Sequence, residues 1–403
     1  MRHGFAVRLL FLALVAFVQH AVFAQQGIDS ESRGGFPMQR TAHFDIRIDP
    51  LDVSQQEAQA LGLQMEGRLA VYNQIFRFDT GRLAMPLRVR AFRSRELYES
   101  HVGSRLSGEV PPGAVYLHFA QAELRELVIH LGNEGDALPF QAFIQFLRAF
   151  VPNPPAWIRD GFAVHFATLG FDEGGEPTHR ENLVWLDAIR GMRELPSPAS
   201  IMRTAAPASV ENFPGLAWSL VSFFLNSGNE NYLRSLTESF VMLSYANTAE
   251  ENAIAVANRI EMWNDMDEMA IDHLNYLNSL RSFSEVIAEG QAAYGASRTA
   301  EAEAAFRRAL EIRPDHYVPW YYLGLLAYNT GDTETAERYY RIALYLGGDT
   351  ASMLYALALN AATAGRTDEA VELLLEIAAI APDRFGERAR TLIAQLENIR
   401  GRQ

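Results

Sequence analysis

Two neighbouring segments decide how the first two thirds of this 403-residue chain fold: residues 141–148 read QAFIQFLR, and residues 154–166 read PPAWIRDGFAVHF. Both predict helices. Apolar residues cover nearly the whole circumference of the first helix, which is typical of a buried helix. Paired prolines open the second segment, and proline fits a first helical turn. Residues three and four positions apart share a helix face, so the first helix keeps one polar ridge, formed by Gln141, Gln145 and Arg148.

This layout resembles the catalytic core of the peptidase MA-like (gluzincin) metallopeptidases. That family carries an HExxH motif on a buried helix and a second helix that begins like PxWLxEGxA. Its two histidines and the later glutamate bind one zinc ion, and the glutamate of HExxH is the general base. The resemblance implies an α+β domain, a small mixed sheet plus helices, over residues 42–280. The second helix supplies the matching residues in order: Pro155, Trp157, Ile158, Asp160, Gly161 and Ala163.

The HExxH motif itself is degenerate in this chain. Gln141 and Gln145 align with the two histidines, Ala142 with the general base, and Asp160 with the third zinc ligand. A glutamine carbonyl is a poor zinc ligand, and alanine cannot accept a proton from water. The resemblance therefore implies a metallopeptidase scaffold without catalytic residues, metal or cofactor. Two alternatives stay open: an ordinary helix pair, or an active hydrolase that uses a non-standard site around Asp160.

A buried Asp160 needs a partner. Arg148 lies about one turn beyond Gln145 on the polar ridge and carries the complementary charge. We predict that Arg148 pairs with Asp160 and that Gln141 and Gln145 donate amide hydrogen bonds to it.

The patterns around these two helices predict the other elements of the domain. Before them we expect strands over 41–48, 87–92, 114–120 and 124–131, and helices over 54–76 and 94–102. Ser54 is expected to cap the first of these helices, and the last two strands are expected to pair. After them we expect a solvent loop over 171–180, a helix over 182–192, an irregular stretch over 195–207, and helices from Leu216 to Leu280.

A period of 34 residues marks the C-terminal part of the chain, residues 283–403. Gly331 and Gly365 are 34 apart, and small or apolar residues repeat with the same spacing. The pattern resembles three tandem tetratricopeptide repeats over 283–316, 317–350 and 351–384, followed by a capping helix over 388–400. The resemblance implies an all-α superhelix in which each helix pair buries its apolar face on the next.

In the repeat family, five positions of each first helix line a groove that binds proteins. Carried over, the resemblance implies a protein or peptide partner held by Tyr321, Leu325, Tyr328, Asn329, Tyr355 and Leu359, with Val318, Ser352, Ala362 and Thr363 beside them. The surface is apolar and aromatic, which suits a peptide or a helix. Alternatively, this short array packs its groove against the preceding domain.

Composition excludes several kinds of chemistry. The chain has no cysteine, and all 35 basic residues are arginine. Disulfides, thiol nucleophiles, Schiff-base lysines and Walker-type phosphate loops are therefore excluded. The formal net charge is −14, which disfavours a nucleic-acid partner.

The first 24 residues predict a signal peptide. Arg2 and Arg8 precede and flank an apolar stretch over 9–18, and small residues end at Ala24. Residues 25–41 then form a polar linker. We predict a secreted or periplasmic protein with no integral membrane segment after cleavage; the alternative is an uncleaved membrane anchor. The predicted function is a non-catalytic pseudo-metallopeptidase in protein–protein interaction or envelope scaffolding. A further hypothesis is a structural repeat protein whose first domain only positions the array.

Overall fold

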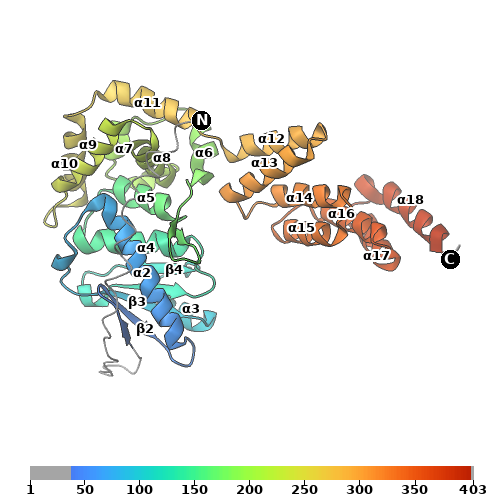
Figure 1. Ribbon diagram of the computed structural model, residues 1–403, viewed down its shortest axis with the longest axis horizontal. Helices are drawn as coiled ribbons and strands as arrows, with labels where there is room; N and C mark the ends of the chain where they lie inside the picture. The colour runs from blue at the N-terminus through green and yellow to red at the C-terminus, as the bar shows by residue number, and fades with distance from the viewer. Residues whose placement is uncertain (1–37, 401–403) are drawn as a thin grey trace. The chain divides into compact units, whose positions relative to one another are not determined.

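The computed structural model describes residues 38–400, which divide after Leu280 into two compact units (Figure 1). The predicted signal peptide over 1–24 and most of the predicted linker lie outside the described residues. Within the described part, no helix combines the length and apolar character that a membrane span needs.

A five-stranded mixed sheet lies within the described residues of the first unit, with the strand order β1-β2-β3-β5-β4. The strands are β1 (Met38–Arg40), β2 (Phe44–Ile48), β3 (Leu87–Phe92), β4 (Ala114–Leu117) and β5 (Glu126–His130). The central strands β2, β3 and β5 are parallel, whereas β1 and β4 run antiparallel at the two edges. The predicted pairing of the last two strands is confirmed. Residues 38–40, predicted as linker, instead form β1, because their backbone pairs with β2.

Helices α2 (Gln55–Phe76) and α4 (Ala137–Phe150) pack on one face of the sheet (Figure 1). Ser54 caps α2 as predicted: its side chain accepts a hydrogen bond from the backbone N–H of Glu57, and the Glu57 carboxylate accepts one from the backbone N–H of Ser54. Helix α3 (Arg95–Gly103) contacts β3 and β5 and buries a smaller cluster that contains Phe92, Tyr98 and Val102.

The second motif helix, α5 (Ala156–Phe166), packs along α8 (Phe213–Asn226). Gly161 allows this close approach, because a Cβ atom there would lie 2.4 Å from the carbonyl oxygen of Ala217. The other helices of this half are α6 (Leu186–Arg190), α7 (Pro198–Met202), α9 (Glu230–Ser239), α10 (Ala249–Glu261) and α11 (Met266–Ser279). Two predictions were incomplete: the loop over 171–180 carries the short hairpin β6 (Gly170–Phe171) and β7 (Pro177–Thr178), and the irregular stretch contains α7.

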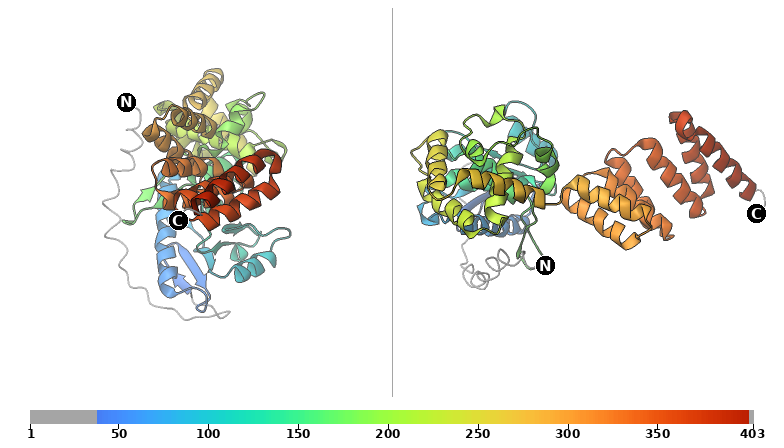
Figure 2. Two further views of the ribbon diagram at one scale, coloured as in Figure 1. Left: turned by 90° about the vertical axis from the view of Figure 1, so that its right-hand side faces the viewer. Right: turned by 90° about the horizontal axis from the view of Figure 1, so that it is seen from above.

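The second unit is a row of helical hairpins (Figure 2). The pairs are α12 (Phe283–Gly295) with α13 (Thr299–Ile312), α14 (Tyr317–Asn329) with α15 (Thr333–Tyr345), and α16 (Thr350–Thr363) with α17 (Thr367–Ile380). The small residues at the 34-residue spacing, Ala302, Ala336 and Ala370, are fully buried between helices. The last helix, α18 (Pro382–Arg400), begins earlier than predicted, since Pro382 opens its first turn.

The turn between the two helices of each repeat uses a left-handed residue. Gly331 and Gly365 have φ of 80° and 76°, and the equivalent position of the first repeat is Ser297 with φ of 58°. Glycine adopts this conformation without the steric penalty that a Cβ atom brings. The first repeat therefore carries local backbone strain that its neighbours avoid.

Candidate functional site

Gln141 and Gln145 join α4 to the sheet by hydrogen bonds. The Oε1 atom of Gln141 accepts a hydrogen bond of 3.1 Å from the backbone N–H of Tyr116 in β4, and the Nε2 atom of Gln145 donates one of 2.8 Å to the carbonyl of Arg88 in β3. Ala142, between them, is buried in the main core. One polar group of each glutamine side chain is thus engaged by the backbone of the sheet.

Asp160 is paired with its sequence neighbour. Its two carboxylate oxygens accept hydrogen bonds of 2.6 and 2.8 Å from Arg159. Arg148 instead donates a 3.0 Å hydrogen bond to the carbonyl of Pro152, just beyond the end of α4. The predicted Arg148–Asp160 pairing, with the glutamines as donors to Asp160, is therefore wrong. Burial and the charge of Arg159 lower the pKa of Arg148.

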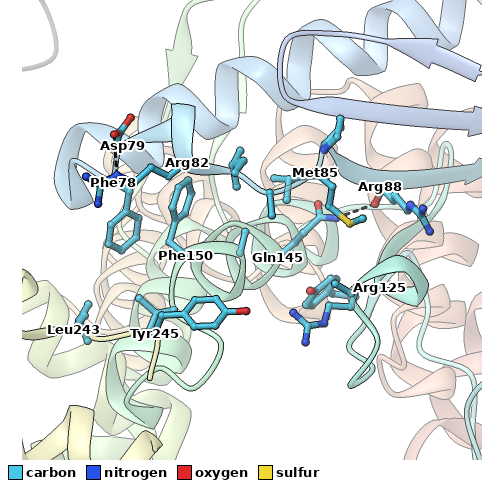
Figure 3. A pocket seen from close by; sticks show the side chains of 18 residues that line it. Phe78, Asp79, Arg82, Met85, Arg88, Arg125, Gln145, Phe150, Leu243 and Tyr245 are labelled. Carbon is cyan, nitrogen blue, oxygen red and sulfur yellow. Dashed lines mark hydrogen bonds and ion pairs between the residues drawn. The ribbon is translucent and has the colours of Figure 1, made fainter. Parts of the chain in front are cut away.

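A cavity of about 400 Å³ opens beside Gln145 (Figure 3). Figure 3 shows aromatic side chains of Phe78 and Phe150 at one end and the Arg125 guanidinium at the other, with Tyr245 between them. Segments far apart in the sequence build these walls: the loop after α2, the end of α4, the loop before β5, and the loop after η6 (Phe240–Met242). A mostly apolar cavity with a few polar groups is the usual form of a ligand site.

The polar end of the cavity is positively charged. Arg125 is held in place because its Nε donates 2.6 Å to the carbonyl of Phe119 and its Nη2 donates 3.1 Å to that of Ala120. Partial burial and the charges of Arg148 and Arg125 lower the pKa of nearby His118 to about 4. An acidic protein thus carries a local positive field here, which suits an anionic group.

His101 in the first unit has a buried structural partner. Glu126 is buried and binds Arg90 at 3.1 Å and His101 at 2.7 Å. His130, on the same strand, stacks on Tyr98 with ring centroids 5.4 Å apart. Among residues 38–400, no three or more histidine, aspartate or glutamate side chains are grouped so that they could hold a metal ion.

Ser219 and His273 form a buried pair that sequence reasoning missed. The Oγ atom of Ser219 lies 3.1 Å from Nε2 of His273, and Ser219 donates its proton 2.8 Å to the carbonyl of Leu216. The tautomer of His273 decides which of the two side chains donates in this pair. Both side chains are fully buried, and burial lowers the pKa of His273 to about 4. The pair is 54 residues apart in sequence, where no local pattern marks it.

In the second unit, the predicted groove residues lie on α14 and α16. Tyr321, Leu325, Tyr328, Tyr355 and Leu359 are half-buried, whereas Asn329 is exposed. Neither helix carries an Asp, Glu or Arg residue within its described bounds.

Polar side chains link the tyrosines from repeat to repeat. Asn329 donates a 3.3 Å hydrogen bond to the hydroxyl of Tyr294, and Thr363 donates one of 3.1 Å to the hydroxyl of Tyr328. Tyr294 was missed in the sequence, although it precedes Tyr328 by one 34-residue period. At the far end, Phe385 of α18 packs on Tyr355 with ring centroids 5.1 Å apart.

The comparisons with known proteins concern this second unit. A family model described as tetratricopeptide repeat matches residues 287–350 and, overlapping them, 323–385. The chain therefore carries C-terminal tetratricopeptide repeats, a class of repeat that suggests interaction with other proteins. No curated protein matches the chain.

Proposed function

We propose that this protein is an exported, non-catalytic relative of the peptidase MA-like metallopeptidases, whose tetratricopeptide repeats hold a protein partner in the cell envelope. The observation that carries the non-catalytic part is the role of the two glutamines. Gln141 and Gln145 fasten α4 to β4 and β3 at the positions where the family has zinc ligands, and Ala142 packs in the core. Amides and an alanine supply neither a tight zinc site nor a base.

Export is supported by the charged and apolar pattern of residues 1–24. Expression of the full chain in a bacterium, followed by N-terminal sequencing of the periplasmic fraction, tests this part. We expect the mature protein to begin at Gln25. Recovery of the uncleaved chain from the cytoplasm alone would contradict the proposal.

Partner binding is supported by the uncharged, tyrosine-rich surface of α14 and α16. Peptides selected from a random library on the full chain can be titrated against a groove variant, Tyr321→Arg. Tyr345→Arg is the matched control, because Tyr345 lies on α15 and is 89% exposed. We expect the selected peptides to lose affinity for Tyr321→Arg only. Equal affinity for both variants would place binding outside the groove.

A further inference from the structure

We propose that the cavity beside Gln145 binds the carboxyl-terminal residue of a peptide whose last side chain is apolar. This inference goes beyond the partner role of the repeats and stands on the cavity alone. It does not depend on the resemblance to metallopeptidases, so a zinc measurement that failed to support the proposed scaffold would leave it intact.

The size and walls of the cavity fit one apolar residue with its backbone. Its volume of about 400 Å³ lies in the range of small-ligand sites. Phe78, Phe150 and Leu243 give it an apolar end (Figure 3). Burial of an aromatic or aliphatic side chain there removes apolar surface from water, which favours binding.

The charge at the other end of the cavity selects a carboxylate. Arg125 donates hydrogen bonds from Nε and Nη2 to two backbone carbonyls, and these bonds hold its guanidinium in a fixed position. Arg82 at the rim is already paired with Asp79 at 3.2 Å. Asp79 is the one acidic side chain among the described residues that line the cavity, so an incoming carboxylate meets little repulsion. Arginine–carboxylate hydrogen bonds are among the stronger polar contacts in proteins.

Gln145 is the second polar feature of the cavity. It favours the carboxyl-terminal residue of a peptide over a carboxylic acid that has no backbone N–H. Its side chain is buried, its Nε2 is bonded to Arg88, and its Oε1 has no hydrogen-bond partner among the described residues. A buried acceptor without a donor costs stability. The terminal residue of a peptide brings both a carboxylate and a backbone N–H, and the N–H satisfies this oxygen once the side chains that cover it move aside.

The test is calorimetric titration of the full-length mature chain with three ligands. They are N-acetyl-leucyl-phenylalanine, its carboxyl-terminal amide, and 3-phenylpropionate, which keeps the carboxylate but lacks the backbone N–H. We expect the free-acid dipeptide to bind at least about tenfold more tightly than either of the other two, a difference of about 1.4 kcal/mol.

Three variants locate the binding. Arg125→Gln should lower the affinity for the free-acid dipeptide to the affinity for its amide. Arg95→Gln is the matched control, since Arg95 on α3 is exposed and does not line the cavity. Ala149→Phe fills the cavity without a change in charge and should abolish binding, so the proposal stays testable even where Arg125→Gln loosens its loop.

Four results would overturn the proposal. They are equal affinities for acid and amide, equal affinities for the dipeptide and 3-phenylpropionate, equal losses in Arg125→Gln and Arg95→Gln, and binding that survives Ala149→Phe. Absence of dipeptide binding to the wild-type chain at millimolar concentration would also overturn it.

Discussion

Gly161 in α5 should tolerate no larger side chain, and Gly161→Ala tests this directly. A Cβ atom at this position would lie 2.4 Å from the carbonyl oxygen of Ala217, 2.7 Å from the carbonyl carbon, and 2.8 Å from a methyl group of Val221. Favourable contacts between carbon atoms need about 3.5 Å, so α5 and α8 would have to separate by about 1 Å. The obstacle is helix backbone, which cannot rotate away as a side chain can.

The expected cost follows from two opposing terms. Overpacking of a close-packed core costs about 3 kcal/mol at the upper end of the usual range, which applies here because Trp157, Phe162 and Leu220 around the contact are fully buried. Alanine recovers about 1 kcal/mol of helix propensity over glycine. The net loss of about 2 kcal/mol lowers the midpoint of thermal unfolding of the first unit by about 6 °C.

Thermal and urea unfolding monitored by circular dichroism would measure this loss. Gly103→Ala is the matched control in the same unit, because a Cβ atom at Gly103 would lie 3.7 Å from Val110, an ordinary contact. We expect the control to be neutral or slightly stabilised. A free energy of unfolding of Gly161→Ala within about 0.5 kcal/mol of the wild-type value, or an equal loss in Gly103→Ala, would contradict this expectation.

Three further predictions concern stability. Ser297→Gly should raise the unfolding free energy of the second unit by about 0.5–1 kcal/mol in urea titrations, because it relieves a positive φ; an unchanged midpoint would argue against strain there. Burial opposes the ionisation of Glu126, but the hydrogen bond with His101 and the charge of Arg90 outweigh it and hold its pKa at about 2. Its contribution of about 3 kcal/mol to the free energy of unfolding is therefore present above pH 4.5 and lost as pH falls toward 2. In Glu126→Gln, the free energy of unfolding should depend less on pH across that window, as urea titrations at several pH values would show. His273 is buried neutral beside Ser219 with a pKa of about 4, so its contribution is present above pH 6.5 and lost toward pH 4, and His273→Gln should remove that slope in the same titrations.

The regular parts of the fold were predictable because they leave periodic patterns in the sequence. Alternation in β2 places Phe44, Ile46 and Ile48 in the core, and the 34-residue period places Ala336 and Ala370 between helices. Each pattern shows which residues of a single helix or strand are buried. Short elements such as α7 and the β6–β7 hairpin are too brief to show a period, so they were missed.

The candidate site was less predictable, because its geometry joins distant segments. Phe78, Arg125 and Tyr245 meet at one cavity although no local pattern connects them. The partner of Asp160 was mistaken for a related reason: ridge spacing favoured Arg148, but the adjacent residue Arg159 donates hydrogen bonds to both carboxylate oxygens. Helical spacing identifies which residues share a face, and it does not decide which of several arginines a carboxylate will bind.

The central claim is that a metallopeptidase scaffold has lost its zinc site, and metal content tests it most directly. Elemental analysis after mild dialysis should find no stoichiometric zinc in the wild-type mature chain. The triple variant Gln141→His, Gln145→His and Asp160→Glu, which leaves the buried Ala142 unchanged, should bind one zinc ion per chain. One zinc per wild-type chain that disappears in Asp160→Ala would contradict the loss of the site, and a folded triple variant without zinc would contradict the scaffold.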